Sequence, residues 1–243
     1  MMSYLDFAEA LATARNEDEA FALFEQAVRE FGYYSVDYAT GTWGRWPIQS
    51  AAEWRIDGYR ASFGWESEYA GTEFQKHDRT VPFASRRTTP WLYWDLWAQP
   101  AEHEVSRRME GRVQSIVASG IGIPFHGPGP RFTGAHLGSR LPPQELARLD
   151  RQTRPMVAMI AALFHEHYQR RHVAEPELRT LSARERECLR WAACGKTSWE
   201  TSMILSISES AVKKHLAAAA AKLGALTRTQ AVAVALSRGL IHL

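Results

Sequence analysis

The 243-residue sequence contains few cysteines and lacks a long apolar run. Its two cysteines, Cys188 and Cys194, have a spacing that matches no zinc or disulfide pattern, so we predict that both are buried small side chains. No segment approaches the roughly 18 consecutive apolar residues that span a bilayer. The first residues are acidic and lack the apolar stretch of a signal peptide. We therefore expect a cytoplasmic protein that does not bind a membrane.

Short motifs of several enzyme classes are also missing. The sequence contains no GxSxG, HExxH or GxGxxG, which would indicate a hydrolase nucleophile, a zinc site or a dinucleotide site. His165 and His167 lie on a predicted helix, where residues two apart do not share a face. We expect no catalytic activity, no metal and no cofactor.

Apolar residues make up 45% of the chain and aromatic residues 11%, enough to form a sizeable core. The net charge of +2 conceals an uneven distribution. Residues 171–243 carry eleven Lys and Arg against six Asp and Glu, whereas the remainder carries eighteen against twenty-one. A basic surplus confined to one part of a chain indicates contact with nucleic acid.

The first 169 residues predict an α+β domain. Residues 17–31 and 142–169 have apolar side chains at helical spacing, whereas residues 33–39 alternate as in a half-buried strand. Ile121, Ile123 and Phe125 form a second alternating run, followed by a turn-rich stretch and RFTGAHLG, a candidate hairpin partner. We predict an α/β/α sandwich around an antiparallel sheet over residues 1–169, a linker over 170–179 and a small all-α domain over 180–243.

Helix-start signals recur in the C-terminal residues. Ser182 with Glu185, and Thr197 with Glu200, each form a predicted capping box. The first helix is expected to bury Leu189 and to end at Gly195, a residue suited to a left-handed conformation.

A third helix is expected to begin at Ser208. One face would bury Val212 and Leu216, and the opposite face would present Ser210, Lys213 and Lys214. A short helix, a tight turn and a longer helix with a cationic face is the helix-turn-helix arrangement, in which the second helix enters the major groove. From spacing alone, a helical hairpin with solvated lysines is an equal alternative.

Sixty residues beginning LSARERECLRWAACGKTSWETSMILSISESAVKKHL resemble the DNA-binding domain of LuxR-type transcription regulators. Glu185, Leu189 and Gly195 fall on the family's most characteristic positions, where we expect a cap, a core residue and a helix end. The resemblance implies that the partner is double-stranded DNA, and that RNA polymerase is a further partner if the protein is an activator. The residues expected at the DNA are Lys196, Ser208, Ser210, Lys213 and Lys214.

The resemblance also implies a homodimer that reads a two-fold symmetric site. The last helix has a narrow stripe of small residues that would allow two such helices to approach closely. This stripe comprises Ala231, Val234, Ala235 and Arg238. Packing of the same stripe within its own domain is the alternative.

The segment WESEYAGTEFQKHD resembles the acyl-homoserine-lactone-binding domain of quorum-sensing LuxR-type receptors. The resemblance implies that the Trp65 indole donates to the lactone carbonyl, that Asp78 accepts the amide N–H, and that the Tyr69 hydroxyl meets the acyl carbonyl. These side chains would satisfy the polar groups of a neutral amide-lactone. That matters because a buried polar group without a hydrogen-bond partner is costly. Without the resemblance, core aromatics and an aspartate that is either a cap or a surface charge would be the preferred interpretation.

Other positions carry the resemblance less closely. In TTPWLYWDLW, Trp94 is the candidate for packing on the lactone ring and Tyr93 is the alternative. Near the acyl carbonyl, where many family members have Ser or Thr, this chain offers His136 or Leu137. Arg79 follows Asp78 where the family usually has proline. Because bulky rings crowd the region, we expect a short, branched or aromatic acyl group.

The sequence thus predicts a transcription factor that binds an acyl-homoserine lactone as its autoinducer and regulates quorum-sensing genes. Two alternatives remain open. A regulator of the same architecture could sense a different small molecule, since Arg79 and the His136-Leu137 pair depart from the family pattern. An enzyme acting on such lactones, fused to a helical module, is the second alternative.

Overall fold

The computed structural model describes residues 3–43, 51–62, 66–127, 131–172 and 181–242. The described residues form two compact units, one on each side of residues 173–180. We call them the N-terminal unit and the C-terminal unit. Among the described residues, no helix has both the length and the apolar character needed to cross a bilayer.

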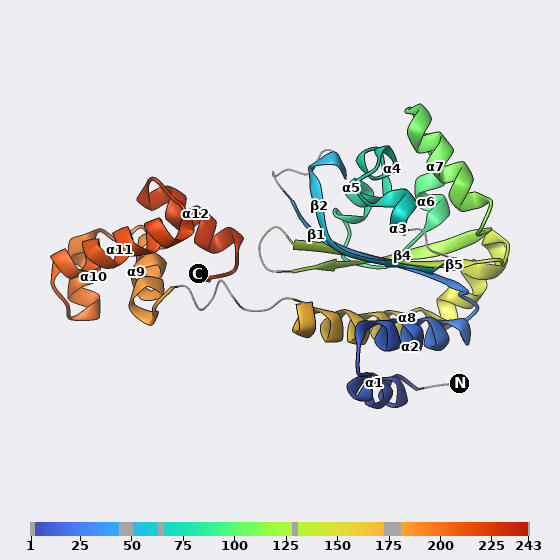
Figure 1. The fold of residues 1–243 in the computed structure, drawn as a ribbon, viewed down its shortest axis with the longest axis horizontal. Coiled ribbons are helices and arrows are strands. Elements are labelled where there is room, and N and C mark those ends of the chain that lie inside the picture. Colours follow the sequence, from blue (N-terminus) through green and yellow to red (C-terminus); the bar gives the residue numbers. More distant parts are fainter. Residues whose placement is uncertain (1–2, 44–50, 63–65, 128–130, 173–180, 243) are drawn as a thin grey trace. The chain divides into compact units, whose positions relative to one another are not determined.

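A five-stranded antiparallel sheet forms the centre of the N-terminal unit (Figure 1). Its strand order is β2-β1-β5-β4-β3. The strands are β1 (Ser35–Trp43), β2 (Trp54–Ala61), β3 (Trp91–Leu92), β4 (Ser119–His126) and β5 (Arg131–Ser139). The predicted hairpin is confirmed, because β4 pairs with β5 and Ile123 lies opposite Ala135.

Helices cover both faces of this sheet, as the predicted sandwich requires. One layer contains α1 (Tyr4–Thr13), α2 (Glu17–Arg29) and α8 (Pro143–His172). The other layer contains short helices, namely η1 (Ala51–Glu53), α3 (Glu66–Tyr69), α4 (Glu73–Lys76), α5 (Thr80–Ala84), α6 (Tyr93–Trp97) and α7 (Glu104–Gln114).

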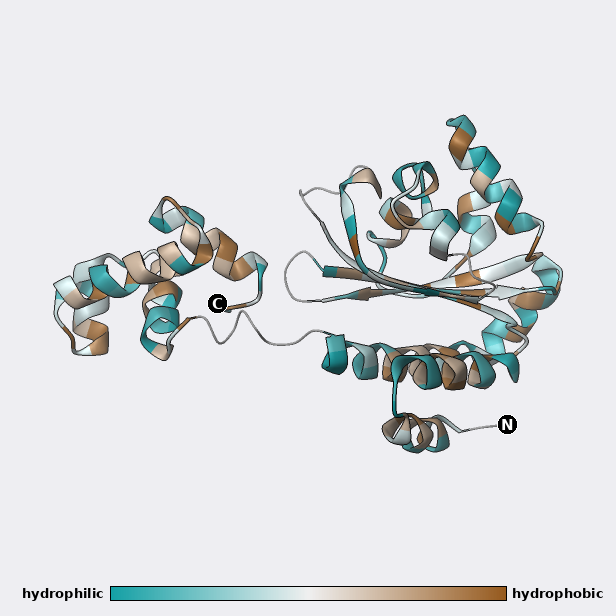
Figure 2. Ribbon diagram, viewed as in Figure 1, coloured by the Kyte–Doolittle hydropathy of each residue, from teal (hydrophilic) through white to brown (hydrophobic). Residues whose placement is uncertain are grey.

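Strand alternation gives each face of the sheet its own core. On β5, Ala135 and Leu137 belong to the cluster that packs under α2 and α8, together with Phe24 and Phe164. Phe132 points to the other face and belongs to a second cluster beneath the short helices. Apolar residues, brown in Figure 2, accordingly lie along the strands and along α8.

Helix α8 extends beyond its predicted end. It continues to His172, so the first three residues of the predicted linker are helical. Contacts with the N-terminal helices explain the extension: Arg171 donates to the carbonyl of Ala14, and His172 lies 3.0 Å from a carboxylate oxygen of Glu17. The rest of the predicted linker lies outside the described residues, so the domain boundary itself stays a prediction.

The C-terminal unit contains α9 (Ala183–Ala193), α10 (Ser198–Leu205), α11 (Glu209–Leu223) and α12 (Arg228–Ser237). Both predicted capping boxes are present, and Ser208 caps α11 through the amide of Ala211. Leu189, Val212, Leu216 and the fully buried Cys188 belong to the core of this unit.

The end of α9 confirms one prediction and corrects another. Gly195 follows α9 with a φ of 78°, the left-handed conformation that glycine adopts without a side-chain penalty. Cys194 is exposed, so the prediction that both cysteines are buried is wrong for this residue. As the C-cap of α9 it stands where the chain leaves the core-facing stripe of the helix.

Candidate functional site

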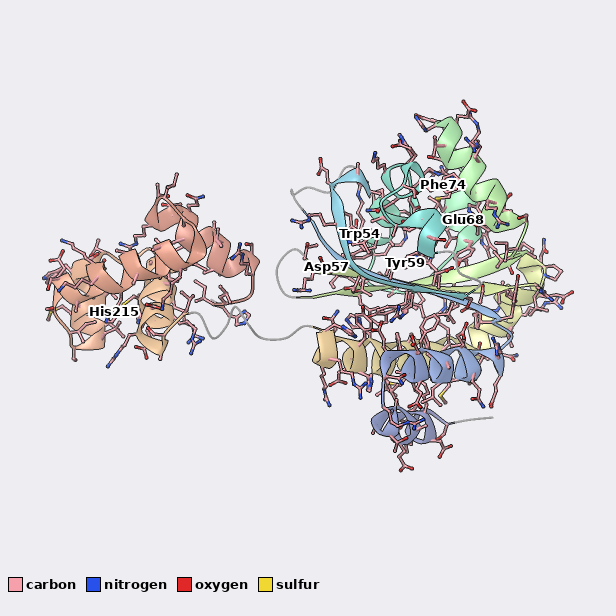
Figure 3. All side chains as sticks on the ribbon, in the orientation of Figure 1. Trp54, Asp57, Tyr59, Glu68, Phe74 and His215 are labelled. Carbon is pink, nitrogen blue, oxygen red and sulfur yellow. The ribbon has the colours of Figure 1, made fainter. Side chains whose placement is uncertain are left out.

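A cavity lies between the sheet and the layer of short helices in the N-terminal unit. Its volume is about 90 Å³. Strands β1, β2 and β5 supply one wall, and Figure 3 labels Trp54 and Tyr59 on β2. Rings dominate the lining, with contributions from Trp54, Tyr59, Tyr69, Trp91, Tyr93, Trp97 and Phe132.

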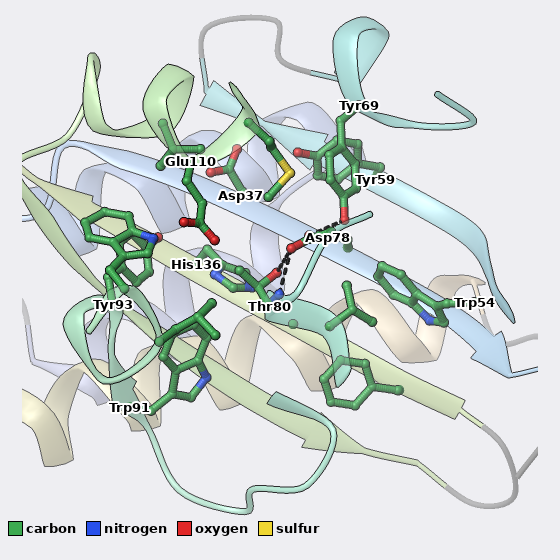
Figure 4. Close-up of a pocket in the computed structure, with 18 residues that line it drawn as sticks. Asp37, Trp54, Tyr59, Tyr69, Asp78, Thr80, Trp91, Tyr93, Glu110 and His136 are labelled. Carbon is green, nitrogen blue, oxygen red and sulfur yellow. Dashed lines mark hydrogen bonds between the residues drawn. The ribbon is translucent and has the colours of Figure 1, made fainter. Parts of the chain in front are cut away.

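Tyr69 and Asp78 meet inside this cavity (Figure 4). The Tyr69 hydroxyl donates to Oδ2 of Asp78 at 2.5 Å. Oδ1 of Asp78 accepts from the backbone N–H of Thr80 at 2.7 Å and from its hydroxyl at 2.6 Å. Asp78 is only 6% exposed, and the hydrogen bonds to Thr80 place its side chain at the start of α5. It therefore combines the capping role and the cavity-lining role that the sequence left as alternatives.

Burial changes the proton affinity of these groups. Desolvation raises the pKa of Asp78 above its usual value, and the hydrogen bonds from Thr80 and Tyr69 oppose that increase. Burial and the neighbouring Asp78 carboxyl raise the pKa of Tyr69, which keeps the hydroxyl protonated as a donor. Tyr69 thus remains a neutral hydroxyl whose one proton is donated to Asp78, and the carboxyl of Asp78 is the acceptor within the cavity.

Trp65, the third member of the predicted set, lies outside the described residues. Its role as a donor to the lactone carbonyl is therefore still a prediction.

Tyr93 lines the cavity and Trp94 does not, which corrects the preferred assignment of Trp94. On α6, residues three and four apart share a face, so Tyr93 lies with Leu96 and Trp97 while Trp94 points elsewhere. Gly120 on β4 makes room for this ring, because a Cβ there would stand 2.4 Å from Cε2 of Tyr93.

His136 and Leu137 are neighbours on strand β5, so their side chains lie on opposite faces of the sheet. His136 lines the cavity, whereas Leu137 is fully buried in the core on the opposite face of the sheet, so its assignment to the ligand site is wrong. The ring of His136 lies 5.7 Å from the ring of Trp91 and 6.0 Å from that of Tyr93, measured between centroids. Desolvation lowers the pKa of His136 to about 4, so the imidazole is neutral near pH 7.

Sequence reasoning missed two acidic residues that line the cavity, Asp37 and Glu110. Asp37 alternates with Val36 and Tyr38 on β1, a pattern that usually places the polar residue in solvent. Here a layer of helices covers that face of the sheet, so the side chain of Asp37 lies inside the unit. Glu110 lies on α7, whose charged sequence EVSRRMEGRVQ gives no signal of a buried face.

The C-terminal unit presents a polar and cationic surface at the start of α11. Lys213 is 65% exposed and forms an ion pair with Glu209, one turn earlier on the helix. Lys214 and Ser210 are exposed, and the hydroxyl of Ser210 lies 3.0 Å from that of Ser208. Lys196 precedes α10 and pairs with Glu200. Helix α10, the turn at Ser206 and helix α11 form the predicted helix-turn-helix.

Two of the predicted dimerisation residues pack within their own unit. Ala231 and Ala235 are fully buried in the core formed with α9 and α11, so they have no surface to offer a second chain. Their prediction is wrong, because the small side chains allow close approach of helices inside the unit. Val234 is partly buried, and Arg238 is exposed.

Glu185 and Lys222 connect α9 to α11. The buried carboxylate of Glu185 accepts from the backbone N–H of Ser182 at 2.6 Å, and Lys222 donates to both of its oxygens at 2.9 and 2.8 Å. Burial alone would raise the pKa of Glu185, but these donors outweigh it and the pKa is lowered. Glu185, Leu189 and Gly195 thus have the structural positions that the sequence indicated.

Comparisons with known proteins agree with this architecture. Residues 16–168 match the family described as "Autoinducer binding domain", and residues 179–235 match "Bacterial regulatory proteins, luxR family". The chain is 30% identical over 243 residues to the transcriptional activator protein BjaR1 of Bradyrhizobium diazoefficiens, a match that covers 98% of this chain and 96% of the relative. It is 26% identical over 180 residues to the transcriptional activator protein LuxR of Aliivibrio fischeri, covering 73% and 71%.

Among solved structures, SdiA of Escherichia coli superposes with a TM-score of 0.69 at 20% identity, covering 99% of this chain and 98% of SdiA. A second structure, of SdiA in complex with octanoyl-rac-glycerol, gives the same TM-score at 19% identity, covering 99% and 96%. These likenesses show a shared fold. The two family matches and the similarity to BjaR1 place the chain in the LuxR family of quorum-sensing transcription regulators, with an autoinducer-binding domain and a helix-turn-helix DNA-binding domain.

Proposed function

We propose that the N-terminal unit binds an acyl-homoserine lactone in the cavity described above. The observation that carries this proposal is the hydrogen-bonded pair of Tyr69 and Asp78 within a cavity lined mainly by rings. An amide-lactone is neutral and apolar except for an N–H group and two carbonyls. A few fixed polar groups in an apolar cavity suit such a ligand.

The existing hydrogen bonds imply an exchange when the ligand binds. The Tyr69 hydroxyl has one proton, which it donates to Asp78 in this structure. To donate to the acyl carbonyl instead, it has to turn away from Asp78, which frees an acceptor site on Oδ2 for the amide N–H of the ligand. In this proposal Trp65 donates to the lactone carbonyl, and Tyr93 packs on the lactone ring.

The rings that line the cavity support a small acyl group. Trp54, Trp91, Tyr93 and Trp97 are four bulky rings in this lining. Because closely packed rings move little to admit a long flexible chain, we propose a short, branched or aromatic acyl group.

Titration calorimetry with lactones of different acyl length tests both the proposed ligand class and the proposed size of the acyl group. We expect N-butanoyl-homoserine lactone, or a branched or aromatic analogue, to bind tightly and the dodecanoyl lactone to bind at least tenfold more weakly. Tight binding of the dodecanoyl compound would contradict the acyl-group proposal, and absence of binding by every lactone would contradict the ligand class.

The C-terminal unit is proposed to bind a two-fold symmetric DNA site as a homodimer, with Ser208, Ser210, Lys213, Lys214 and Lys196 at the DNA. The exposed cationic start of α11 supports this role. Dimerisation through α12 would have to use its exposed side together with Arg238, the residue that follows the helix, because Ala231 and Ala235 are buried. Ligand binding would favour the DNA-competent dimer, and contact with RNA polymerase would follow if the protein is an activator.

One observation favours a second candidate ligand class. His136 replaces the Ser or Thr that the family resemblance leads one to expect near the acyl carbonyl, and its neutral imidazole can donate or accept. A non-lactone amide or ester would satisfy the same groups. The calorimetric panel distinguishes the two classes if it includes the corresponding acyl amides without a lactone ring.

A further inference from the structure

The cavity is bounded by acidic groups from different elements. Asp37 comes from β1, Asp78 precedes α5, and Glu110 comes from α7. Among the described residues that line the cavity, none is Lys or Arg. A wall of this composition disfavours an anionic ligand and favours a neutral ligand that donates hydrogen bonds.

Glu110 is held in a fixed position at this wall. Its side chain is 12% exposed, and Oε1 accepts from Nε of Arg79 at 2.7 Å. Arg79 is only 21% exposed, and its Nη2 lies 3.4 Å from the backbone carbonyl oxygen of Leu96 on α6. Arg79 therefore connects α7 to α6 and sets the orientation of the carboxylate.

The second oxygen of Glu110 has unused acceptor capacity. Within the part of the chain that the structure describes, no group donates to Oε2, and protein atoms do not enclose it completely. Figure 4 shows the carboxylate directed into the cavity. His136 also faces the cavity, and no described residue forms a hydrogen bond with its ring.

The unused acceptor on Glu110 disfavours a purely apolar acyl group. A purely apolar group that filled the cavity would remove water from Oε2 without replacing the lost hydrogen bond, which is unfavourable for a carboxylate. A hydroxyl on the acyl group would restore that hydrogen bond. A site built to hydrogen-bond a hydroxyl discriminates strongly against the analogue that lacks it.

We propose that Glu110 is a specificity-determining residue that selects a ligand whose acyl group carries a hydrogen-bond donor such as a hydroxyl, with Arg79 as its positioning residue. This inference rests on the proposed lactone function. It adds the substituent on the acyl group that the cavity would recognise. It assigns a role to Arg79, the residue that stands where the family resemblance leads one to expect proline.

Matched pairs of lactones that differ by one hydroxyl test the inference on the unmodified protein. The probes are the butanoyl and 3-hydroxybutanoyl, hexanoyl and 6-hydroxyhexanoyl, and phenylacetyl and 4-hydroxyphenylacetyl homoserine lactones, compared by calorimetry. We expect the hydroxylated member of at least one pair to bind roughly tenfold or more tightly. Equal or weaker binding of the hydroxylated member in every pair overturns the inference while the proposed function stands. No binding by any lactone overturns both.

Variants then assign the preference to Glu110. Glu110→Leu is expected to abolish the difference in affinity between the paired lactones, whereas Glu104→Leu, on the exposed surface of the same helix, should keep it. Arg79→Met should reduce the preference without abolishing binding of the hydroxyl-free lactone. A preference that survives Glu110→Leu in folded protein would overturn the assignment. The double variant Arg79→Met with Glu110→Leu gives the same test without an unpaired buried cation.

Discussion

At the scale of single residues, Asp78 has two roles in one carboxyl group. Oδ1 caps the start of α5 through Thr80, and Oδ2 is shared with Tyr69 inside the cavity. Loss of the Oδ2 acceptor leaves the buried hydroxyl of Tyr69 unsatisfied, which typically costs about 1–3 kcal/mol, and loss of Oδ1 removes the partner of the half-buried Thr80. In the proposed function, ligand recognition and local structure are therefore coupled at this position.

Asp78→Ala is expected to weaken lactone binding by at least tenfold, because the amide N–H of the ligand and the Tyr69 hydroxyl lose their acceptor. Tyr69→Phe should have a smaller effect, since it removes a single donor. Asp95→Ala is the matched control: Asp95 also accepts a backbone N–H at a helix start, but it is exposed and does not line the cavity. Equal losses for the aspartate variants in calorimetry would remove Asp78 from the binding site.

His136 predicts the pH dependence of stability. Burial lowers its pKa from 6.5 to about 4 in the folded protein, so the unfolded chain binds more protons between these values. This contribution is present above pH 6.5 and is lost as the pH falls towards 4. His165, whose pKa is also lowered to about 4 by burial, acts in the same direction.

The free energy of unfolding of the N-terminal unit should therefore decrease from pH 7 to pH 5, by up to about 1.4 kcal/mol per pH unit for each histidine. In His136→Gln the decrease in the free energy of unfolding should be smaller by about the contribution of one histidine. Urea unfolding at both pH values measures the difference. An identical pH dependence in the variant would show that His136 does not titrate in this range.

The residues of the candidate ligand site differ in how far the sequence could identify them. Tyr69 and Asp78 were found through a motif, whereas Trp94 and Leu137 each proved to be one position away from the residue that lines the cavity. In both cases the side chains of neighbouring residues point in different directions, so the choice depends on the register of an element within the fold. Ala231 and Ala235 show the related problem that an apolar stripe does not reveal which surface covers it.

At the scale of elements, the sequence predicted the helices of the C-terminal unit well, because their starts carry local signals. Ser182, Thr197 and Ser208 accept the backbone N–H groups that their sequence positions indicated. Helix α7 gave no comparable signal: its charged residues conceal a face that lines the cavity through Met109, Glu110 and Val113. Tertiary packing, which is not local, decides the burial of that face.

Two glycine substitutions should have opposite effects on stability. An added Cβ would meet no atom within 4 Å at either Gly111 or Gly195, so only the backbone distinguishes them. Gly111 is inside α7, and Gly111→Ala should stabilise the N-terminal unit by about 0.4–1 kcal/mol. Gly195 has a φ of 78°, and Gly195→Ala should destabilise the C-terminal unit by about 1–2 kcal/mol. Thermal denaturation of both variants checks the signs, and a stabilising Gly195→Ala would refute the capping role.

Lys213→Ala is expected to weaken DNA binding and to reduce its dependence on salt by about one released ion. The control is Lys76→Ala, which removes a similarly exposed lysine from an ion pair within a helix of the N-terminal unit. Fluorescence anisotropy over a salt series provides both quantities. Unchanged affinity and slope for Lys213→Ala would exclude this face of α11 from the DNA interface.

At the scale of the whole molecule, the two units have separate cores and separate proposed tasks. A ligand that binds only the folded N-terminal unit stabilises it by mass action, and its effect on DNA binding requires a difference in ligand affinity between DNA-competent and incompetent states. The family membership covers both units and defines the overall role. It does not specify the ligand, which depends on the residues that line this cavity, Glu110 and His136 among them.

The most direct test of the central claim is mass spectrometry of an organic extract of the purified full-length protein. The protein is produced in cells supplied with a mixture of acyl-homoserine lactones, and Asp78→Ala protein is prepared in parallel. We predict that the unmodified protein retains one lactone in near-stoichiometric amount, with a short, branched or aromatic acyl group, and that the variant retains almost none. Folded protein without any retained lactone, or equal retention by the variant, would contradict the proposed binding site.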